Sequence, residues 1–170
     1  MKAYERFLKY IAVWTASDEN SKSVPTTKRQ LDLGALLVEE IKALGLSDVK
    51  MDEYGYVYGY LPATEGMEAV PALGLIAHLD TAPDYNGRDV KPQLIENYDG
   101  KDVELGTSGK VLTVKDFPRL SSYKGRTLIT TDGTSLLGAD DKAGIAEILT
   151  VVEELMQEKT PHGKLCIAFT

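Results

Sequence analysis

The sequence lacks the features that mark secreted, membrane-spanning or nucleic-acid-binding proteins. Its 170 residues include a single cysteine, Cys166, so no internal disulfide can form, which favours the cytoplasm. No apolar run approaches the length of a membrane span, and the first residues contain no signal-peptide core. Acidic residues outnumber basic ones 26 to 19, and like charges form no long block. We therefore expect a cytoplasmic protein that binds neither a membrane nor nucleic acid.

Several common catalytic motifs are missing as well. No Gly-Lys-Ser/Thr sequence forms a phosphate loop, and no Gly-x-Ser-x-Gly elbow marks a serine hydrolase. Cys166 lies within an apolar stretch and is expected in the core rather than as a nucleophile. His162 follows a proline in a predicted turn and is expected to be solvated. Nucleotide binding through a phosphate loop and covalent catalysis by serine or cysteine are thus disfavoured.

Hydrophobic periodicity predicts an α/β fold with a mixed, partly parallel sheet and flanking helices. The predicted helices cover 3–15, a segment starting at a Thr26 or Thr27 cap and ending near Gly45, and 145–156. The predicted strands are a hairpin over 49–60, a strand at 72–77 covered on both faces, short pieces at 93–96, 111–114, 127–130 and 135–137, and a buried strand at 164–170.

Two features of this prediction concern the arrangement of the chain. Residues 81–126 are rich in turn residues and are expected to form a long excursion from the core rather than a second domain. Strand, helix and strand over 127–170 are interpreted as a βαβ unit, which would make part of the sheet parallel.

Acidic and imidazole side chains follow two of the predicted strands. His78 and Asp80 come directly after the strand at 72–77, and their spacing of two places them on one side of an extended chain. Asp140 and Asp141 lie in a loop of small residues, Gly138-Ala-Asp-Asp-Lys-Ala-Gly144, before a helix. Because ligands of open α/β sheets bind beyond the carboxyl ends of strands, these groups could share one metal site.

Simpler interpretations remain open for each pair. A histidine and an acid two residues apart occur often by chance in polar loops. One aspartate before a helix is explained by capping of its first backbone N–H groups, worth ~1 kcal/mol. The second aspartate has no such explanation, and the two strand ends together favour metal-assisted hydrolysis.

Two longer stretches carry a resemblance to a known family. Residues 75–82, Leu-Ile-Ala-His-Leu-Asp-Thr-Ala, and residues 131–147, which contain the Gly-Ala-Asp-Asp-Lys-Ala-Gly loop, resemble the peptidase T family of tripeptide aminopeptidases. That family lies within the superfamily of di-zinc aminoacylases and glutamate carboxypeptidases. The resemblance extends over essentially the whole sequence, with the Asp84-Tyr-Asn86 loop also typical.

The resemblance implies a role for each residue of the two strand ends. His78 would be a ligand of one zinc ion, Asp80 the catalytic acid that orients His78, and Asp140 the carboxylate that bridges both zinc ions. It also implies a cis peptide bond between Asp140 and Asp141. Two zinc ions per site would activate a water molecule for attack on a short peptide substrate.

Family members are much longer than 170 residues. Their general-base glutamate, their remaining metal ligands and their lid domain follow the position at which this sequence ends. The expected domain organisation is therefore residues 1–170 as the N-terminal portion of the catalytic domain, inactive alone, without the lid or the C-terminal part. Two alternatives stay open: a related deacylase or carboxypeptidase, and an association module that self-associates through an unpaired sheet edge at 164–170.

Overall fold

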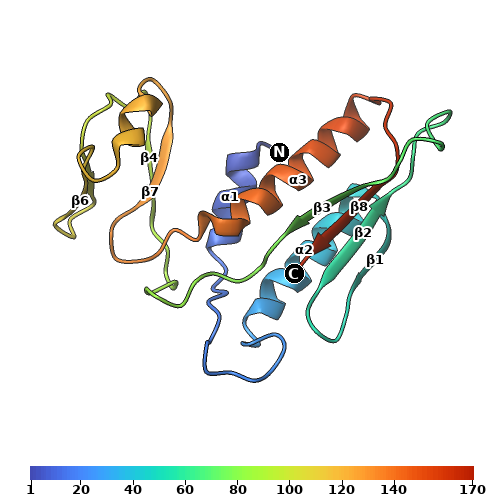
Figure 1. Ribbon diagram of the computed structural model, residues 1–170, viewed down its shortest axis with the longest axis horizontal. Coiled ribbons are helices and arrows are strands. Elements are labelled where there is room, and N and C mark those ends of the chain that lie inside the picture. Colours follow the sequence, from blue (N-terminus) through green and yellow to red (C-terminus); the bar gives the residue numbers. More distant parts are fainter. The chain divides into compact units, whose positions relative to one another are not determined.

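The computed structural model describes all of residues 1–170 (Figure 1). The chain divides into two compact units, one formed by residues 1–83 and 138–170 and the other by residues 84–137. The first unit contains α1 (Ala3–Ile11), α2 (Gln30–Leu44), β1 (Ser47–Met51), β2 (Val57–Leu61), β3 (Leu73–Ala77), α3 (Ala139–Gln157) and β8 (Leu165–Phe169). The second contains β4 (Pro92–Ile95), β5 (Val103–Leu105), β6 (Lys110–Leu112), the 3₁₀ helix η1 (Pro118–Tyr123) and β7 (Leu128–Thr131).

The sheet of the first unit has four strands in the order β1-β2-β8-β3. β2 pairs antiparallel with β1 and β8, whereas β3 and β8 are parallel, which confirms the predicted mixed, partly parallel sheet. β8 is hydrogen-bonded on both sides, so the prediction of an unpaired edge at 164–170 is wrong. The edge strands are β1 and β3. β8 lies inside the sheet because it pairs with β3, which comes about 90 residues earlier in the sequence, as well as with β2.

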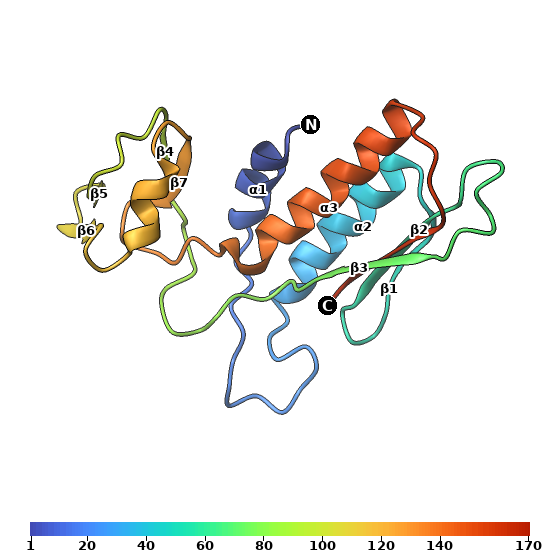
Figure 2. The ribbon, with the colours of Figure 1, turned by 45° about the horizontal axis from the view of Figure 1, so that its top comes forward.

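Helices cover one face of this sheet (Figure 2). On that face the strands present Val57 and Leu61 from β2 and Ile167 and Phe169 from β8, all buried. The residues between them, such as Tyr58 and the half-buried Cys166, belong to the opposite face. The regular alternation in β2 and β8 is that of strands with a single covered face.

β3 is more exposed than its apolar sequence predicts. Leu73 and Ile76 are 55% and 69% exposed, so the expectation of a strand covered on both faces is wrong. Ile76 lies on the face without helices, and Leu73 lies on the covered face but near the end of an edge strand. Only Ala77, next to the site described below, is fully buried.

The limits of the helices follow from local contacts. α2 buries Leu33, Leu37 and Ile41 completely and ends at Gly45, whose φ of 88° allows the left-handed cap that the sequence predicts. Neither threonine caps its start, because the helix begins later, at Gln30, where Arg29 takes the cap position without a side-chain hydrogen bond. The Thr27 hydroxyl donates instead to the carbonyl of Ala16 at 2.9 Å. The predicted helix over 3–15 ends at Ile11 because the next residues run beside the chain near Thr81.

A buried arginine joins the three helices. Arg6 of α1 is only 2% exposed, and its guanidinium pairs with Glu40 of α2 and Glu153 of α3, each at 2.8 Å. It also donates to the Thr150 hydroxyl at 3.0 Å. Burial of this charge is compensated by two carboxylates, so the helices depend on a polar network as well as on apolar contacts.

The second unit has its own small hydrophobic cluster. β4 pairs with β7 and β5 with β6, both antiparallel, around buried Tyr98, Val103 and Leu105. β7 therefore belongs to a different sheet from β8, and the predicted βαβ unit over 127–170 is wrong. The parallel pair comes instead from β3 and β8. Residues 135–137 form no strand, and β5 and η1 were not predicted.

No helix combines the length and the apolar character needed to cross a bilayer.

Candidate metal centre

The segment after β3 is held between two other parts of the first unit. The N–H of Leu79 donates to the Thr170 carbonyl at 2.6 Å, just beyond β8, and the N–H of Thr81 donates to the Thr15 carbonyl at 3.2 Å. The Leu79 side chain is buried, whereas His78 and Asp80 on either side of it are partly exposed. The period of two predicted from the sequence therefore places both polar side chains on the open side.

The His78 ring contacts a carboxylate at each nitrogen. Nδ1 lies 3.1 Å from Asp80 Oδ1 and 2.9 Å from the Asp80 carbonyl, so it carries the hydrogen that both acceptors require. Nε2 lies 3.0 Å from Asp140 Oδ1, 62 residues further along the chain. The structure thus brings together the three residues that the sequence singled out.

These carboxylates change the proton affinity of the ring. Partial burial alone would lower the pKa of His78, but hydrogen bonding to Asp140 and Asp80 outweighs it and raises the pKa above its ordinary value. A cation on Nε2 is therefore favoured at this position. A metal ion is such a cation, and it would compete with the proton for the same nitrogen.

The stretch from Gly138 to Asp141, here called the Asp140 loop, includes the first residues of α3, where Asp140 and Asp141 have non-helical backbone angles. It begins with a glycine in the left-handed region. Gly138 has φ of 73°, and a Cβ on it would lie 3.0 Å from Thr81 Cγ2. The loop therefore lies directly against the segment that carries Asp80. The peptide bond between Asp140 and Asp141 is cis, as the family resemblance implies.

The two aspartates of this loop have different surroundings. Asp141 Oδ1 accepts the backbone N–H of Gly144 at 3.2 Å, which is the capping role that the sequence allows for one of them. Asp140 is 93% exposed, and its one polar contact is with His78. Capping therefore explains Asp141 and leaves the Asp140 carboxylate free to bind a ligand.

His78 and Asp140 fit a divalent cation as two of its ligands. Zinc binds imidazole nitrogen and carboxylate oxygen at about 2.0–2.2 Å, which places two such ligand atoms about 3.3–3.5 Å apart in a tetrahedral site. The observed separation of 3.0 Å between Nε2 and Oδ1 is slightly shorter, so a small movement of the exposed Asp140 side chain would admit the ion. No group of three or more histidine, cysteine or acidic residues is arranged to hold a metal, so the 170 residues supply an incomplete ligand set.

Sequence reasoning gave no role to Lys142, which follows the two aspartates. Its side chain is 2% exposed, and Nζ donates to the carbonyl of Val13 at 2.7 Å. Burial lowers the pKa of Lys142 to about 8. A lysine beside small and acidic residues usually faces solvent, so the sequence gives no indication that Lys142 is buried. The only signal is its place in a cluster of polar residues at the start of a helix.

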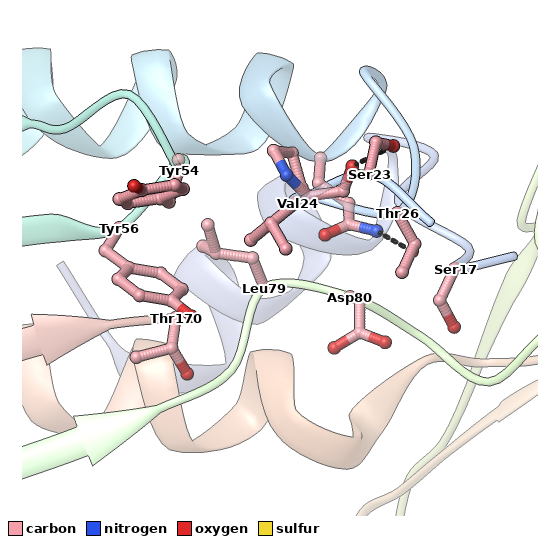
Figure 3. Close-up of a pocket in the computed structure, with 12 residues that line it drawn as sticks. Ser17, Ser23, Val24, Thr26, Tyr54, Tyr56, Leu79, Asp80 and Thr170 are labelled. Atoms are coloured by element: carbon pink, nitrogen blue, oxygen red, sulfur yellow. Dashed lines mark hydrogen bonds between the residues drawn. The ribbon is translucent and has the colours of Figure 1, made fainter. Parts of the chain in front are cut away.

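A cavity of about 210 Å³ lies beside the centre (Figure 3). Asp80 and Leu79 form one side of it, and Tyr54, Tyr56, Ser17 and Thr26 lie around the rest. Its lining includes Asp80 but neither His78 nor Asp140, so the space between His78 and Asp140 is not part of this cavity.

The remaining sequence candidates lie elsewhere in the first unit. The Nδ1 of His162 lies 2.8 Å from the Gly163 carbonyl, and its backbone N–H donates to the Thr64 hydroxyl at 3.0 Å. The turn expected at 161–163 is not formed, because the chain turns earlier, at 158–159, after α3. Cys166 is a half-buried thiol on the face of β8 opposite the buried residues, so its expected place in the core is wrong. Neither joins a metal-binding cluster.

Comparison with known proteins relates the chain to peptidases. It is 56% identical over 168 residues to a peptidase T from Clostridium acetobutylicum and 55% identical over 168 residues to one from Desulfitobacterium hafniense. Each match covers 98% of this chain, but only 41% and 40% of those relatives. No protein-family model matches the chain.

Solved structures point in the same direction. A tripeptidase from Staphylococcus aureus matches with a TM-score of 0.64 at 25% identity, over 99% of this chain and 35% of that one. An aminopeptidase PepT from Bacillus cereus has the same fold, with a TM-score of 0.66 at 21% identity and the same coverage. The chain is thus related over essentially its whole length to the peptidase T proteins, and it spans about two-fifths of the curated relatives it matches.

Proposed function

We propose that the chain is part of a metal-dependent aminopeptidase that releases the N-terminal residue from tripeptides in the cytoplasm. The observation that carries this proposal is the approach of His78 Nε2 to Asp140 Oδ1 at 3.0 Å. This pair lies within a chain more than half identical to proteins named peptidase T. Imidazole and carboxylate at one exposed position are typical of hydrolytic metal sites.

In the proposed centre His78 and Asp140 bind metal and Asp80 orients the imidazole. Asp80 already holds Nδ1–H, which directs the Nε2 lone pair towards the cation position. Zinc is the expected metal, with two ions in the complete site and Asp140 as the bridge. When bound, the metal would supply a water molecule whose pKa is lowered towards ~7.

The rest of the ligand set is proposed to come from the additional length found in the relatives. Structural and catalytic zinc sites use three or four protein ligands, and this chain brings together only one imidazole and one free carboxylate. We therefore expect the 170 residues alone to bind zinc weakly and to hydrolyse no peptide.

The test uses the gene product that contains this chain, incubated with a tripeptide of three different residues. The proposal predicts release of the N-terminal amino acid, loss of activity with a chelator, and recovery with zinc. Release of the C-terminal amino acid would identify a carboxypeptidase instead, and cleavage of only N-acyl amino acids a deacylase.

Matched histidine variants show whether the centre is the one described. His78→Ala should abolish hydrolysis, and Asp80→Asn should lower metal affinity or activity by about 10–100-fold because the ring loses its orienting acid. His162→Ala is the control, since His162 is the other histidine of the chain and contacts Gly163 and Thr64 instead of the metal-binding pair. Equal activity of His78→Ala and His162→Ala would contradict the proposal.

A further inference from the structure

Lys142 is a buried charge without a counter-ion. Its side chain is 2% exposed, it forms no ion pair with any carboxylate, and its one hydrogen bond runs to the Val13 carbonyl at 2.7 Å. Burying an unpaired ammonium group is unfavourable, and a methionine of similar volume would avoid this cost. We therefore expect Lys142 to have a structural role other than filling space in the core.

The segment that receives this hydrogen bond also holds the other half of the metal centre. Residues 13–17, here called the bracket, run parallel to the chain at Thr81, with a bridge between Ala16 and Thr81. Thr81 donates its N–H to Thr15 at 3.2 Å and accepts the N–H of Ser17 at 3.0 Å. Thr81 directly follows Asp80, so the bracket holds the segment that carries His78 and Asp80.

The Asp140 loop contacts the same place. A Cβ on Gly138 would meet Thr81 Cγ2 at 3.0 Å and the Lys142 side chain at 4.0 Å. The Asp140 side chain is 93% exposed and has no polar partner other than His78. Its position therefore depends on the backbone of its own loop, and Lys142 is the side chain that ties this loop to the bracket.

We propose that Lys142 is a positioning residue that sets the separation between Asp140 and His78 by anchoring the Asp140 loop to the bracket. The hydrogen bond to Val13 fixes the start of α3, and the Thr81 contacts fix the end of the His78 segment. Both proposed metal ligands are therefore held in place by the bracket. The inference rests on the proposed function in that it takes this pair as the metal-binding pair.

The first test reads the His78–Asp140 contact directly, without metal. Ring-nitrogen chemical shifts of the two histidines are recorded for the 170-residue chain, with His162→Gln used to assign His78. Asp140→Ala provides the spectrum of a His78 ring that has lost its Nε2 partner. Lys142→Met and Lys142→Gln lack the ammonium group that donates to Val13. Both should reproduce the large change of the Nε2 shift seen in Asp140→Ala, with a much smaller change at Nδ1, which still donates to Asp80.

Two further variants separate positioning from general destabilisation. Leu149→Ala removes a fully buried side chain from the same helix, and it should lower the melting temperature but leave both His78 shifts as in the wild type. Lys142→Arg keeps a donor and should retain part of the wild-type Nε2 shift. Wild-type shifts in both Lys142→Met and Lys142→Gln, or changed shifts in Leu149→Ala, would overturn the inference.

The second test measures zinc binding by calorimetry on the same substitutions made in the gene product that contains this chain, because the 170 residues alone supply an incomplete ligand set. Lys142→Met should bind zinc about 10-fold more weakly than the wild type, as expected when a ligand loses its support, while Leu149→Ala binds normally. If the wild-type gene product binds no zinc, the proposed metal centre fails, and the metal-free shifts still decide the role of Lys142. If both wild type and Lys142→Met bind zinc equally, the metal centre stands and the positioning role is refuted.

Discussion

Two neighbouring aspartates in the non-helical first residues of α3 show how closely placed residues of one type take different roles. Asp141 turns back onto the N–H of Gly144, whereas Asp140 points to His78. A Cβ on Gly144 would lie 2.4 Å from Asp141 Oδ1, so the glycine leaves room for the cap. The small residues of the loop are thus required by the carboxylate that they surround.

This arrangement predicts that the effect of Gly144→Ala on stability changes sign when the Asp141 carboxylate is removed. Gly144→Ala should destabilise the chain by about 1–2 kcal/mol, because the new methyl group displaces the capping carboxylate. In an Asp141→Ala background the same substitution should stabilise the chain by up to ~1 kcal/mol, since alanine favours the helix. Urea unfolding of the four proteins measures both values, and the same sign in both backgrounds would contradict the capping role.

For single residues, the sequence predicts on which side of the chain a side chain lies better than it predicts which distant residue that side chain contacts. The spacing of His78 and Asp80 was sufficient to place both on one side of the chain, because the alternation of an extended segment is a local property. The pairing of Lys142 with Val13 could not be predicted, since it joins residues 129 positions apart through a backbone carbonyl. Such an acceptor exists at every residue and leaves no mark in the sequence.

Among the elements, the three helices are connected by Arg6. Arg6→Met should lower the free energy of unfolding by about 3 kcal/mol, because Glu40 and Glu153 lose a buried partner. Lys9→Met is the control: Lys9 contacts the same Glu40 from a side chain 44% exposed, and its loss should change stability by less than ~1 kcal/mol. Similar losses in the two variants would show that the buried network contributes little.

The same network predicts a dependence on pH. Burial alone would raise the pKa of Glu40, but hydrogen bonds from Lys9 and Arg6 outweigh it and hold the pKa below its ordinary value. A carboxyl with a lower pKa in the folded chain stabilises the fold above its unfolded pKa, and this contribution is lost as the pH falls through the folded pKa. Glu40→Gln should therefore lose less stability than the wild type between about pH 6 and pH 3. Parallel losses in urea unfolding at both pH values would contradict this.

β3 provides a second test at the level of elements. The apolar run at 72–77 predicts a strand covered on both faces, but the structure leaves Ile76 69% exposed at a sheet edge. Ile76→Lys should therefore change the stability of the 170-residue chain by less than ~0.5 kcal/mol, compared with about 2–5 kcal/mol for Leu149→Ala in the core. A large loss for Ile76→Lys would restore the prediction made from the sequence.

At the scale of the whole molecule, local patterns predicted most elements but not their partners. Strand β7 follows the apolar pattern expected and precedes α3, yet it pairs with β4 in another sheet. β8 was correctly predicted as a strand, but its position between β2 and β3 depends on pairings across the whole length of the first unit. Periodicity reports which side of a strand is buried and carries no information on which strand lies beside it.

The division into two units predicts that damage to one stays local. Val103→Ala removes part of the hydrophobic cluster of residues 84–137 and should speed amide exchange in β5 and β6. The amides of α3 and the ring-nitrogen shifts of His78 should stay unchanged, because both belong to the first unit. Faster exchange throughout α3 would show that the two units unfold together.

The central claim is that His78 and Asp140 hold a metal ion, and anomalous diffraction from crystals grown with zinc tests it most directly. A zinc ion held by this pair would give an anomalous peak about 2.0–2.2 Å from both His78 Nε2 and an Asp140 carboxylate oxygen. The peak should vanish in Asp140→Ala and persist in His162→Ala. Zinc bound only at His162, or no peak between His78 and Asp140 under conditions that saturate the protein, would contradict the account.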